Sequence, residues 1–317
     1  MYVQVVKTPL YGADGKIIGL QGIFWDITQQ RLAEEKIRRI NAQLAKSRNE
    51  LRGKNAQMQD DLKMAREIQL TMLPQQYPVF PSSASAAESA FHFNHRYLPS
   101  GTVGGDFFAV SALSDHEAAV FICDVAGHSV RSALVTAMIR ALVEELKPVA
   151  TEPGQFLTRL NSDLHAILKH TGSPMLTTAF DLVADAKTGT MRYANAGHPK
   201  PLLIRRSARE VQPLVNSVGK SQPVLGLFEH AHYDTSETKL GPEDMVLLFT
   251  DGLYEVQNRN NELYSQALLV AGVERRLDLD APDLFDELLA EVQDFSAENA
   301  FSDDVCLVSV EFEGARI

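Results

Sequence analysis

Short apolar runs bounded by polar turns recur along the chain from residue 91 onward, with stretches of helical periodicity between them. Residues 119–123 (AVFIC) and 245–249 (MVLLF) carry no polar alternation, which is typical of buried strands. The full pattern predicts strands at 91–98, 105–112, 117–123, 176–183, 190–194, 201–204, 232–235, 245–249 and 305–312, and helices at 129–147, 154–169, 265–275 and 281–295. Residues 206–222 show neither period and are expected to be irregular, and the Ser-, Ala- and Pro-rich residues 78–90 are expected to form a mobile loop. Strand-rich ends around a helical middle predict a mixed α and β sandwich.

The first 28 residues have the pattern of a β-hairpin. Strand-like residues 2–6 and 17–25 flank a turn that contains Gly12, Asp14 and Gly15. An isolated hairpin is only marginally stable in water, so we expect this segment to be the end of something larger.

Residues 29–70 contain no proline and are densely charged, which predicts one long helix. Apolar residues recur in it every seven positions, at Ile37, Leu44, Leu51, Met58 and Ala65. The companion seam is poorer, because Ser47, Lys54 and Asp61 stand between Ile40 and Ile68. Such a pattern favours a weak coiled coil, and we hypothesise a parallel dimeric linker; a solvated single helix is the alternative. Residues 64–74 (MAREIQLTMLP) end the helix at Pro74.

Carboxylates stand at the ends of four separate strand candidates. They are Asp106 in GGDFF, Asp124 in DVAGH, Asp251 in FTDG, and Asp303 with Asp304 in SDDV. Any one of them could be a solvated turn residue. Converging carboxylates repel one another unless a cation neutralises them, and oxygen ligands without a cysteine cluster select Mg²⁺ or Mn²⁺ over zinc. The set therefore predicts a metal site.

Five motifs in order carry a resemblance to a known family: GGDFF (104–108), DVAGH (124–128), NAGHPKPLLI (195–204), LLFTDGLYEV (247–256) and SDDVCLVSV (302–310). Together they resemble the SpoIIE/RsbU-type serine phosphatases, a bacterial branch of the metal-dependent (2C, or PPM) protein phosphatases. The resemblance covers roughly residues 60 to 314. It implies an antiparallel β-sandwich flanked by helices on both outer faces, an α-β-β-α arrangement. Residues 15–28 (GKIIGLQGIFWDIT) resemble the last two strands of a PAS sensor domain, and an unrelated hairpin is the alternative.

The resemblance implies a site that holds two Mn²⁺ or Mg²⁺ ions. Asp106, Asp124, Asp251, Asp303 and the backbone carbonyl of Val125 are the implied ligands, with Asp304 the less certain half of its pair. Asp124 is the expected bridging ligand, because it lies at the strongest strand-to-turn junction. The two ions would activate a water for attack on phosphorus, so no nucleophilic side chain is needed.

Histidines near these motifs have less certain roles. His128 is a candidate general acid, and a helix-capping role is the alternative. Asn195 and His198 match a family turn close to the cleft, where stabilising the turn is expected of Asn195 rather than catalysis. The chain departs from the family pattern at Ser129, Ala109 and Cys306, and none of these removes a predicted ligand. Ser129 still suits a helix N-cap.

Composition limits the class of protein and its partners. The 317 residues carry a formal net charge of −11, which disfavours nucleic-acid binding and hence a metal nuclease that would need a basic groove. Cys123 and Cys306 are expected to be buried thiols of a reducing compartment. No apolar run approaches the ~18 residues of a membrane span and no signal peptide is recognisable, so we expect a cytoplasmic location without direct membrane insertion.

These expectations combine into one hypothesis. Residues 1–28 would be a PAS-like remnant, residues 29–75 a linker helix and homodimer contact, and residues 76–317 a phosphatase domain. The activity would be hydrolysis of phosphoserine or phosphothreonine in a partner protein, by resemblance a STAS-type anti-sigma-factor antagonist. The alternative is a catalytically inactive dimeric scaffold, although a scaffold has no reason to retain converging charges.

Overall fold

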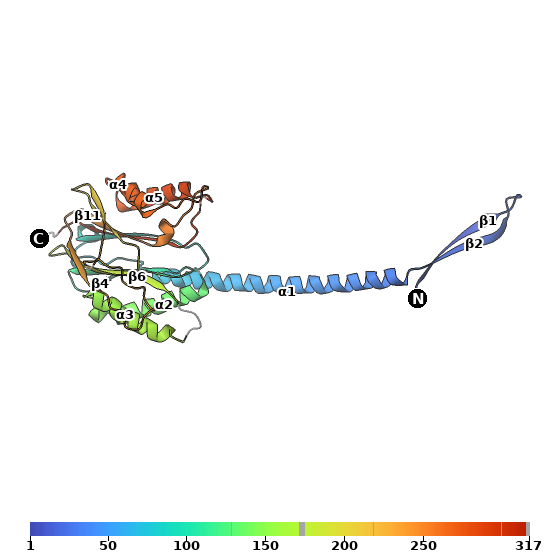
Figure 1. The fold of residues 1–317 in the computed structure, drawn as a ribbon, viewed down its shortest axis with the longest axis horizontal. Coiled ribbons are helices and arrows are strands. Elements are labelled where there is room, and N and C mark those ends of the chain that lie inside the picture. The colour runs from blue at the N-terminus through green and yellow to red at the C-terminus, as the bar shows by residue number, and fades with distance from the viewer. Residues whose placement is uncertain (128, 171–174, 218, 299, 315–317) are drawn as a thin grey trace. The chain divides into compact units, whose positions relative to one another are not determined.

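A computed structural model describes residues 1–127, 129–170, 175–217, 219–298 and 300–314 of the chain (Figure 1). The chain divides into two compact units, residues 1–61 and residues 62–317. The domain boundaries expected from the sequence lie at residues 28 and 75, and those remain predictions.

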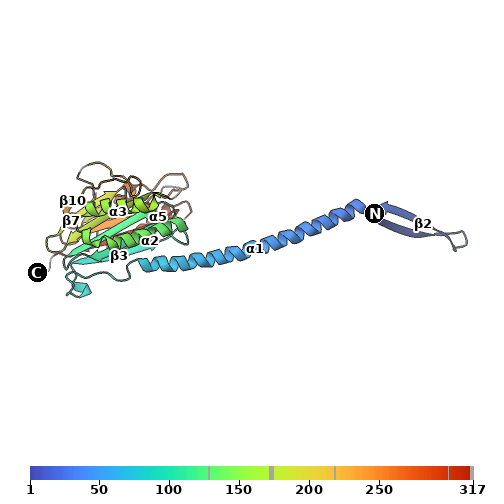
Figure 2. The same ribbon diagram turned by 90° about the horizontal axis from the view of Figure 1, so that it is seen from below.

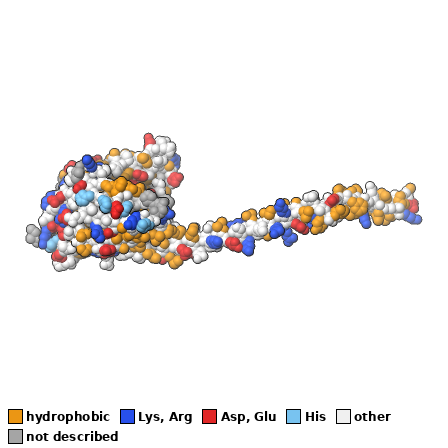
Figure 3. All heavy atoms as spheres, turned by 60° about the horizontal axis from the view of Figure 1, so that its bottom comes forward, with side chains coloured by type: hydrophobic (Ala, Val, Ile, Leu, Met, Phe, Trp, Pro, Cys, Tyr) orange, Lys and Arg blue, Asp and Glu red, His pale blue; other side chains and the backbone are white. Residues whose placement is uncertain are grey.

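The first unit contains an antiparallel hairpin and most of one long helix. Strand β1 (Val3–Tyr11) pairs with β2 (Ile17–Asp26), and the turn between them places Gly15 at φ 73°, a conformation that glycine adopts at little cost. Helix α1 (Thr28–Met72) follows directly and has 45 residues, and its last eleven residues belong to the second unit. Hydrophobic side chains lie exposed along both the hairpin and α1 (Figure 3).

Two antiparallel sheets of five strands form the second unit. The first sheet has the order β10-β7-β6-β5-β4 and the second the order β3-β12-β11-β8-β9. The strands are β3 (Phe91–Leu98), β4 (Asp106–Ala112), β5 (Glu117–Val125), β6 (Thr177–Asp185), β7 (Thr190–Ala196), β8 (Leu202–Arg205), β9 (Glu210–Pro213), β10 (Ser236–Lys239), β11 (Asp244–Phe249) and β12 (Val305–Phe312).

Helices cover the outer face of each sheet. Helices α2 (Val130–Glu145) and α3 (Pro153–Leu168) contact the first sheet, and α4 (Gln266–Glu274) and α5 (Ala281–Phe295) contact the second. Figure 1 shows the two sheets between these helix pairs, and Figure 2 looks onto α2 and α3. Short 3₁₀ turns occupy Ala86–Glu88, Lys147–Val149 and Asp251–Leu253. The predicted α-β-β-α sandwich with a long N-terminal helix is confirmed.

Strands β11 and β12 show why their sequences are almost continuously apolar. Successive side chains of a strand point to opposite faces of its sheet. Val246 and Leu248 of β11 therefore pack into the core between the sheets, whereas Leu247 and Phe249 pack under α4 and α5. Both faces are covered, so neither needs polar residues. Cys123 and Cys306 are buried free thiols within the first of these cores, as expected.

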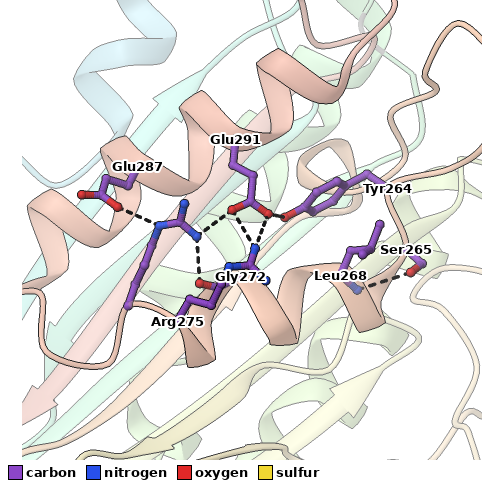
Figure 4. Close-up of polar contacts among 8 residues, drawn as sticks. Tyr264, Ser265, Leu268, Gly272, Arg275, Glu287 and Glu291 are labelled. Atoms are coloured by element: carbon purple, nitrogen blue, oxygen red, sulfur yellow. Dashed lines mark hydrogen bonds and ion pairs between the residues drawn. The ribbon is translucent and has the colours of Figure 1, made fainter.

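A polar network ties α4 to α5 on the outside of the second sheet (Figure 4). The carboxylate of Glu291 on α5 accepts hydrogen bonds from Tyr264 Oη at 2.7 Å, Arg275 at 2.8 Å and Arg276 at 2.7 Å. Arg276 also binds Glu287 and the carbonyl of Gly272. One partly buried acceptor thus joins two helices and the segment before them.

Three local expectations were wrong. Residues 232–235 form no strand, because Tyr233 N and Thr235 Oγ1 bond to Thr158 and Gly154 of α3 and the next strand begins at Ser236. The supposedly irregular residues 206–222 include strand β9, which pairs with β8. The loop at 78–90 is anchored by Phe80, whose fully buried ring packs edge-on against Phe91.

Candidate metal centre

Two of the predicted ligands face each other across neighbouring strands. Asp106 opens β4 and Asp124 lies one residue from the end of β5, and the antiparallel register pairs them directly. Directly opposed residues lie on the same face of a sheet, so the two carboxylates share one end of the sandwich. Thr250, at the end of β11, donates its hydroxyl to Asp106 Oδ2 at 2.6 Å and thereby joins the second sheet to this site.

The other two motifs meet at the same end of the second sheet. Asp251 begins the short 3₁₀ turn after β11, and Asp303 and Asp304 precede β12, the antiparallel neighbour of β11. The turns pack so closely that a methyl group added to Gly252 would lie 2.0 Å from the carbonyl oxygen of Asp304. Only glycine fits at this position.

The carboxylates lie near enough to perturb one another. Burial raises the pKa of Asp106 well above its usual range, and the charge of Asp124 adds to the effect. Burial followed by the charges of Asp251 and Asp303 raises the pKa of Asp124 to about 7. The pKa of Asp251 rises to about 6 through burial and then the charges of Glu255 and Asp303. Such a set of acids is stabilised by a bound cation.

Asp304 is already occupied by protein donors. Its Oδ1 accepts hydrogen bonds from the backbone N–H and hydroxyl of Ser100 at 2.7 and 3.0 Å, and its Oδ2 accepts one from Gly105 N at 2.6 Å. Asp303 is only partly buried and uses Oδ1 to accept the N–H of Asp304. Asp304 therefore holds the loop before β4, whereas Asp303 remains more accessible.

Gly105 brings that loop against Val125. Val125 N donates to Gly105 O at 3.2 Å, and a methyl group added to Gly105 would lie 2.3 Å from the Val125 carbonyl oxygen. The preceding Gly104 is held by Gln69 near the end of α1. The Gln69 amide donates to Gly104 O at 2.7 Å and accepts from Gly104 N at 3.0 Å.

The structure describes one of the two motif histidines, His198, and the residues that neighbour both. His128 lies outside the described residues, so its role as a general acid stays a prediction. Ser129 caps α2 by accepting a hydrogen bond from Ser132 N, as expected. Asn195 closes its turn through bonds to both the N–H and the carbonyl of His198. Burial lowers the pKa of His198 to about 3, with a smaller opposing effect of the Phe249 carbonyl, so this histidine is neutral.

Several residues around the carboxylates were not predicted as part of the site. Gln69, Ser100 and Thr250 hold the loops that carry the acids. Gln69 and Thr250 lie within the segments 64–74 and 247–256 singled out above, although no role was predicted for either, and nothing in its local sequence distinguishes Ser100. Glu255 lies close enough to raise the pKa of Asp251, and its place four residues after Asp251 could have suggested a sixth acid.

The donor set fits hard cations, because every candidate side-chain ligand is a carboxylate. As placed, no three His, Cys, Asp or Glu side chains within the described ranges are grouped tightly enough to hold a metal ion. The acids thus share one end of the sandwich without being gathered into ligand geometry.

The fold is similar to those of known phosphatase domains. It is similar to the SiaA-PP2C domain of Pseudomonas aeruginosa, with a TM-score of 0.68 at 22% identity over 81% of this chain and 98% of that one. It is also similar to the PP2C phosphatase domain of SpoIIE from Bacillus subtilis, with a TM-score of 0.57 at 16% identity over 70% of this chain and 64% of that one. The sandwich is therefore a PP2C-type phosphatase fold.

The sequence defines the family within this fold. Residues 114–313 match the model of the family described as stage II sporulation protein E (SpoIIE), and the chain belongs to that family. Phosphoserine phosphatase RsbP of Bacillus subtilis is 25% identical over 252 residues, 79% of this chain and 57% of RsbP. Phosphoserine phosphatase RsbU of the same organism is 24% identical over 257 residues, 80% of this chain and 71% of RsbU. The chain thus spans little more than half the length of RsbP.

No helix in the described part of the chain combines the length and the apolar character needed to cross a membrane.

Proposed function

We propose that this protein is a metal-dependent phosphoprotein phosphatase that hydrolyses phosphoserine or phosphothreonine. The observation that carries the proposal is the location of Asp106, Asp124, Asp251 and Asp303 at one end of a PP2C-type sandwich, near enough that their charges raise pKa values within the group. Membership of the SpoIIE family and the phosphoserine phosphatases among its relatives support it.

In this proposal Asp106, Asp124, Asp251, Asp303 and the carbonyl of Val125 would hold two Mn²⁺ or Mg²⁺ ions. When bound, the ions supply charge neutralisation for the phosphoryl group and lower the pKa of a water that acts as nucleophile. Asp304 acts as a positioning residue instead, because both its oxygens accept protein hydrogen bonds. Through Ser100 and Gly105 it sets the path of the loop that delivers Asp106 to the site.

The charges of the site exclude some roles and favour others. His198 is neutral and buried, so it cannot protonate the departing serine oxygen at neutral pH. Thr250 keeps Asp106 oriented from the opposite sheet by donating its hydroxyl to one carboxylate oxygen. His128 remains the proposed general acid.

The proposed substrate is a phosphorylated regulator protein of the STAS type, and the proposed assembly is a homodimer through α1. The substrate rests on the family resemblance, and the phosphoserine phosphatase names of RsbP and RsbU support its chemical class. The dimer rests on the heptad residues of α1, which stay 58–65% exposed in a single chain: Ile37, Leu44, Leu51 and Met58. Residues 1–28 are proposed to continue a PAS-like sensor.

Hydrolysis of p-nitrophenyl phosphate tests the activity. We expect turnover with Mn²⁺, none in EDTA, and a loss of at least about 100-fold in Asp124→Ala and Asp251→Ala, because removing a group that stabilises developing charge costs that much. Asp294→Ala is the matched control, since Asp294 is an exposed acid of α5 that is not among the main charges acting on Asp124 and Asp251.

The control should retain full activity, and all variants should show the same circular dichroism. Activity that survives both site substitutions would refute the site. A folded wild-type protein that stays inactive with Mn²⁺ would favour the scaffold instead.

A further inference from the structure

A cavity of about 480 Å³ opens beside the carboxylates, and the proposed chemistry does not use it. One wall is the turn between β7 and β8, which contributes His198 and Lys200. The other wall is the segment that follows β9, which contributes Val215, Asn216, Lys220 and Gln222.

The second wall is tied firmly to the sandwich. Tyr193 of β7 donates its hydroxyl to the carbonyl of Val215 at 2.8 Å, and Ser217 N donates to Ser236 Oγ of β10 at 2.9 Å. Gln222 Nε2 donates to Asp234 Oδ2 at 2.9 Å. A wall fixed at three points loses little conformational freedom when a ligand binds, which favours affinity.

Strand pairing places the cavity next to the proposed metal centre. Thr178 of β6 is the cross-strand partner of Asp124. Its hydroxyl lies 2.8 Å from Nδ1 of His198, a residue of the cavity wall. A chain whose phosphoserine lies at the carboxylates therefore reaches the cavity within a few residues, since neighbouring strands are only about 4.8 Å apart.

The charge of the cavity is opposite to that of its surroundings. Lys200 and Lys220 both line it, and no Asp or Glu does. Neither lysine forms an ion pair with a carboxylate in the described part of the chain. The protein as a whole carries a net charge of −11, and Asp124, Asp251 and Glu255 lie together nearby. Uncompensated cations beside such acids favour an anionic ligand.

We propose that this cavity binds acidic residues that flank the phosphorylated serine of the protein substrate. The inference rests on the proposed function and adds a specificity site to it. Lys200 and Lys220 would attract the flanking carboxylates, and Val215, which is 54% exposed, would provide an apolar contact for the peptide. The lysines would also offset the repulsion between an acidic peptide and the acids of the centre.

Peptide binding in EDTA tests the cavity without hydrolysis. Two labelled phosphoserine peptides are compared by fluorescence anisotropy, one with Asp and Glu on both sides of the phosphoserine and one with Ser and Gln. We expect the wild-type protein to bind the acidic peptide about 3- to 10-fold more tightly at low salt, as two exposed ion pairs allow. The preference should shrink towards 1 M salt, where the screening length falls to about 3 Å.

Lys200→Glu/Lys220→Glu should abolish or reverse this preference. Lys187→Glu is the matched control, because Lys187 is an exposed lysine in the turn at the far end of β6 and β7. It should retain the preference. Equal binding of both peptides by the wild-type protein, or an unchanged preference in the double variant, overturns the proposal. Competition by inorganic phosphate that displaces only the acidic peptide from the lysines would identify a free-anion site and overturn it too.

Kinetics separate this proposal from the proposed function. The double variant should hydrolyse p-nitrophenyl phosphate within about twofold of the wild-type rate but lose its advantage on the acidic phosphopeptide, mainly through KM. A wild-type protein that hydrolyses neither substrate refutes the phosphatase activity. In that case the binding preference in EDTA still tests whether the cavity binds acidic residues.

Discussion

Gly105 illustrates how much of the site depends on one residue that has no side chain. Its N–H donates to Asp304, its carbonyl accepts bonds from Val125 N and Thr136 Oγ1, and its Cα lies against the Val125 carbonyl. These contacts bring together the loop before β4, the end of β5 and the start of β12. A side chain at this position would push the three apart.

We therefore expect Gly105→Ala to destabilise the protein by about 1–3 kcal/mol, the usual cost of overpacking, and to lose most phosphatase activity. Urea denaturation and p-nitrophenyl phosphate hydrolysis measure the two effects. Gly53→Ala is the comparison variant, because an added methyl group at Gly53 meets nothing within 4 Å, so this substitution should keep the activity and raise rather than lower the stability. Normal stability and activity in Gly105→Ala would contradict the close approach.

The raised pKa values of the acids predict how the metal-free protein responds to pH. Asp124, at about 7, and Asp251, at about 6, bind protons in the folded protein that the unfolded chain releases near pH 4. The folded state thus holds more protons between about pH 4 and 7, and its stability falls as the pH rises through this range.

In EDTA at pH 7.5, the wild-type protein should be less stable than Asp124→Asn by on the order of 2 kcal/mol. Its melting temperature should accordingly be lower by about 4–8 °C. The two should converge at pH 5. Mn²⁺ should raise the melting temperature of the wild-type protein more at pH 7.5 than at pH 5.5, because protons compete with the metal. A Mn²⁺ effect that grows as the pH falls would contradict this.

At the scale of secondary-structure elements, the α4 and α5 pair is held by Glu291. Burial raises the pKa of Glu291, but the hydrogen bonds from Tyr264, Arg275 and Arg276 outweigh it, so the net pKa lies below the ordinary value. A lowered carboxylate pKa stabilises the folded protein above the pKa of the unfolded chain, and this contribution is lost as the pH falls.

Glu291→Gln should accordingly cost about 1 kcal/mol at pH 7, a value kept small because the network is partly exposed. The cost should shrink as the pH falls through the lowered pKa of Glu291. Urea denaturation at several pH values measures it, with the exposed Asp294→Asn on the same helix as the control. Equal losses in both variants would argue against a specific network.

Helix α1 offers a second test at this scale. Gly53 lies in its interior, where glycine is less favourable than alanine by up to about 1 kcal/mol. Gly53→Ala should raise the helical content and the melting temperature seen by far-UV circular dichroism. Gly15→Ala should have the opposite effect on the hairpin, because Gly15 adopts φ 73°. A gain in both variants would contradict the backbone argument.

At the scale of the whole molecule, we expect the protein to self-associate through α1. Sedimentation velocity at micromolar concentration should show a dimer for the wild-type protein and a monomer for Leu44→Lys/Leu51→Lys, whose substitutions remove two apolar seam residues. Lys54→Leu repairs the poor companion seam and should tighten the dimer. A wild-type protein that is monomeric at these concentrations rules out the dimeric linker.

The local pattern of apolar and polar residues predicted most helices and strands of this fold. It failed where long-range contacts determine the backbone conformation. The apolar runs of β5, β11 and β12 identify strands because burial on both faces leaves few polar positions. The strand expected at 232–235 was wrong, because bonds to α3 occupy that backbone instead of a neighbouring strand. Strand β9 was missed because it is short and only Val211 in it is buried.

The sequence by itself determined most strands of the sandwich and singled out the acids proposed for its site, because strand periodicity and the carboxylates at strand ends are local features. Only the tertiary structure decided that Asp304 holds the loop of Gly105, a residue 199 positions away, and that Gln69 holds Gly104 across 35 positions. It alone placed Lys200 and Lys220 in one cavity beside Thr178. Such partners meet because strand pairing brings distant segments together, and no local pattern of residues encodes that meeting.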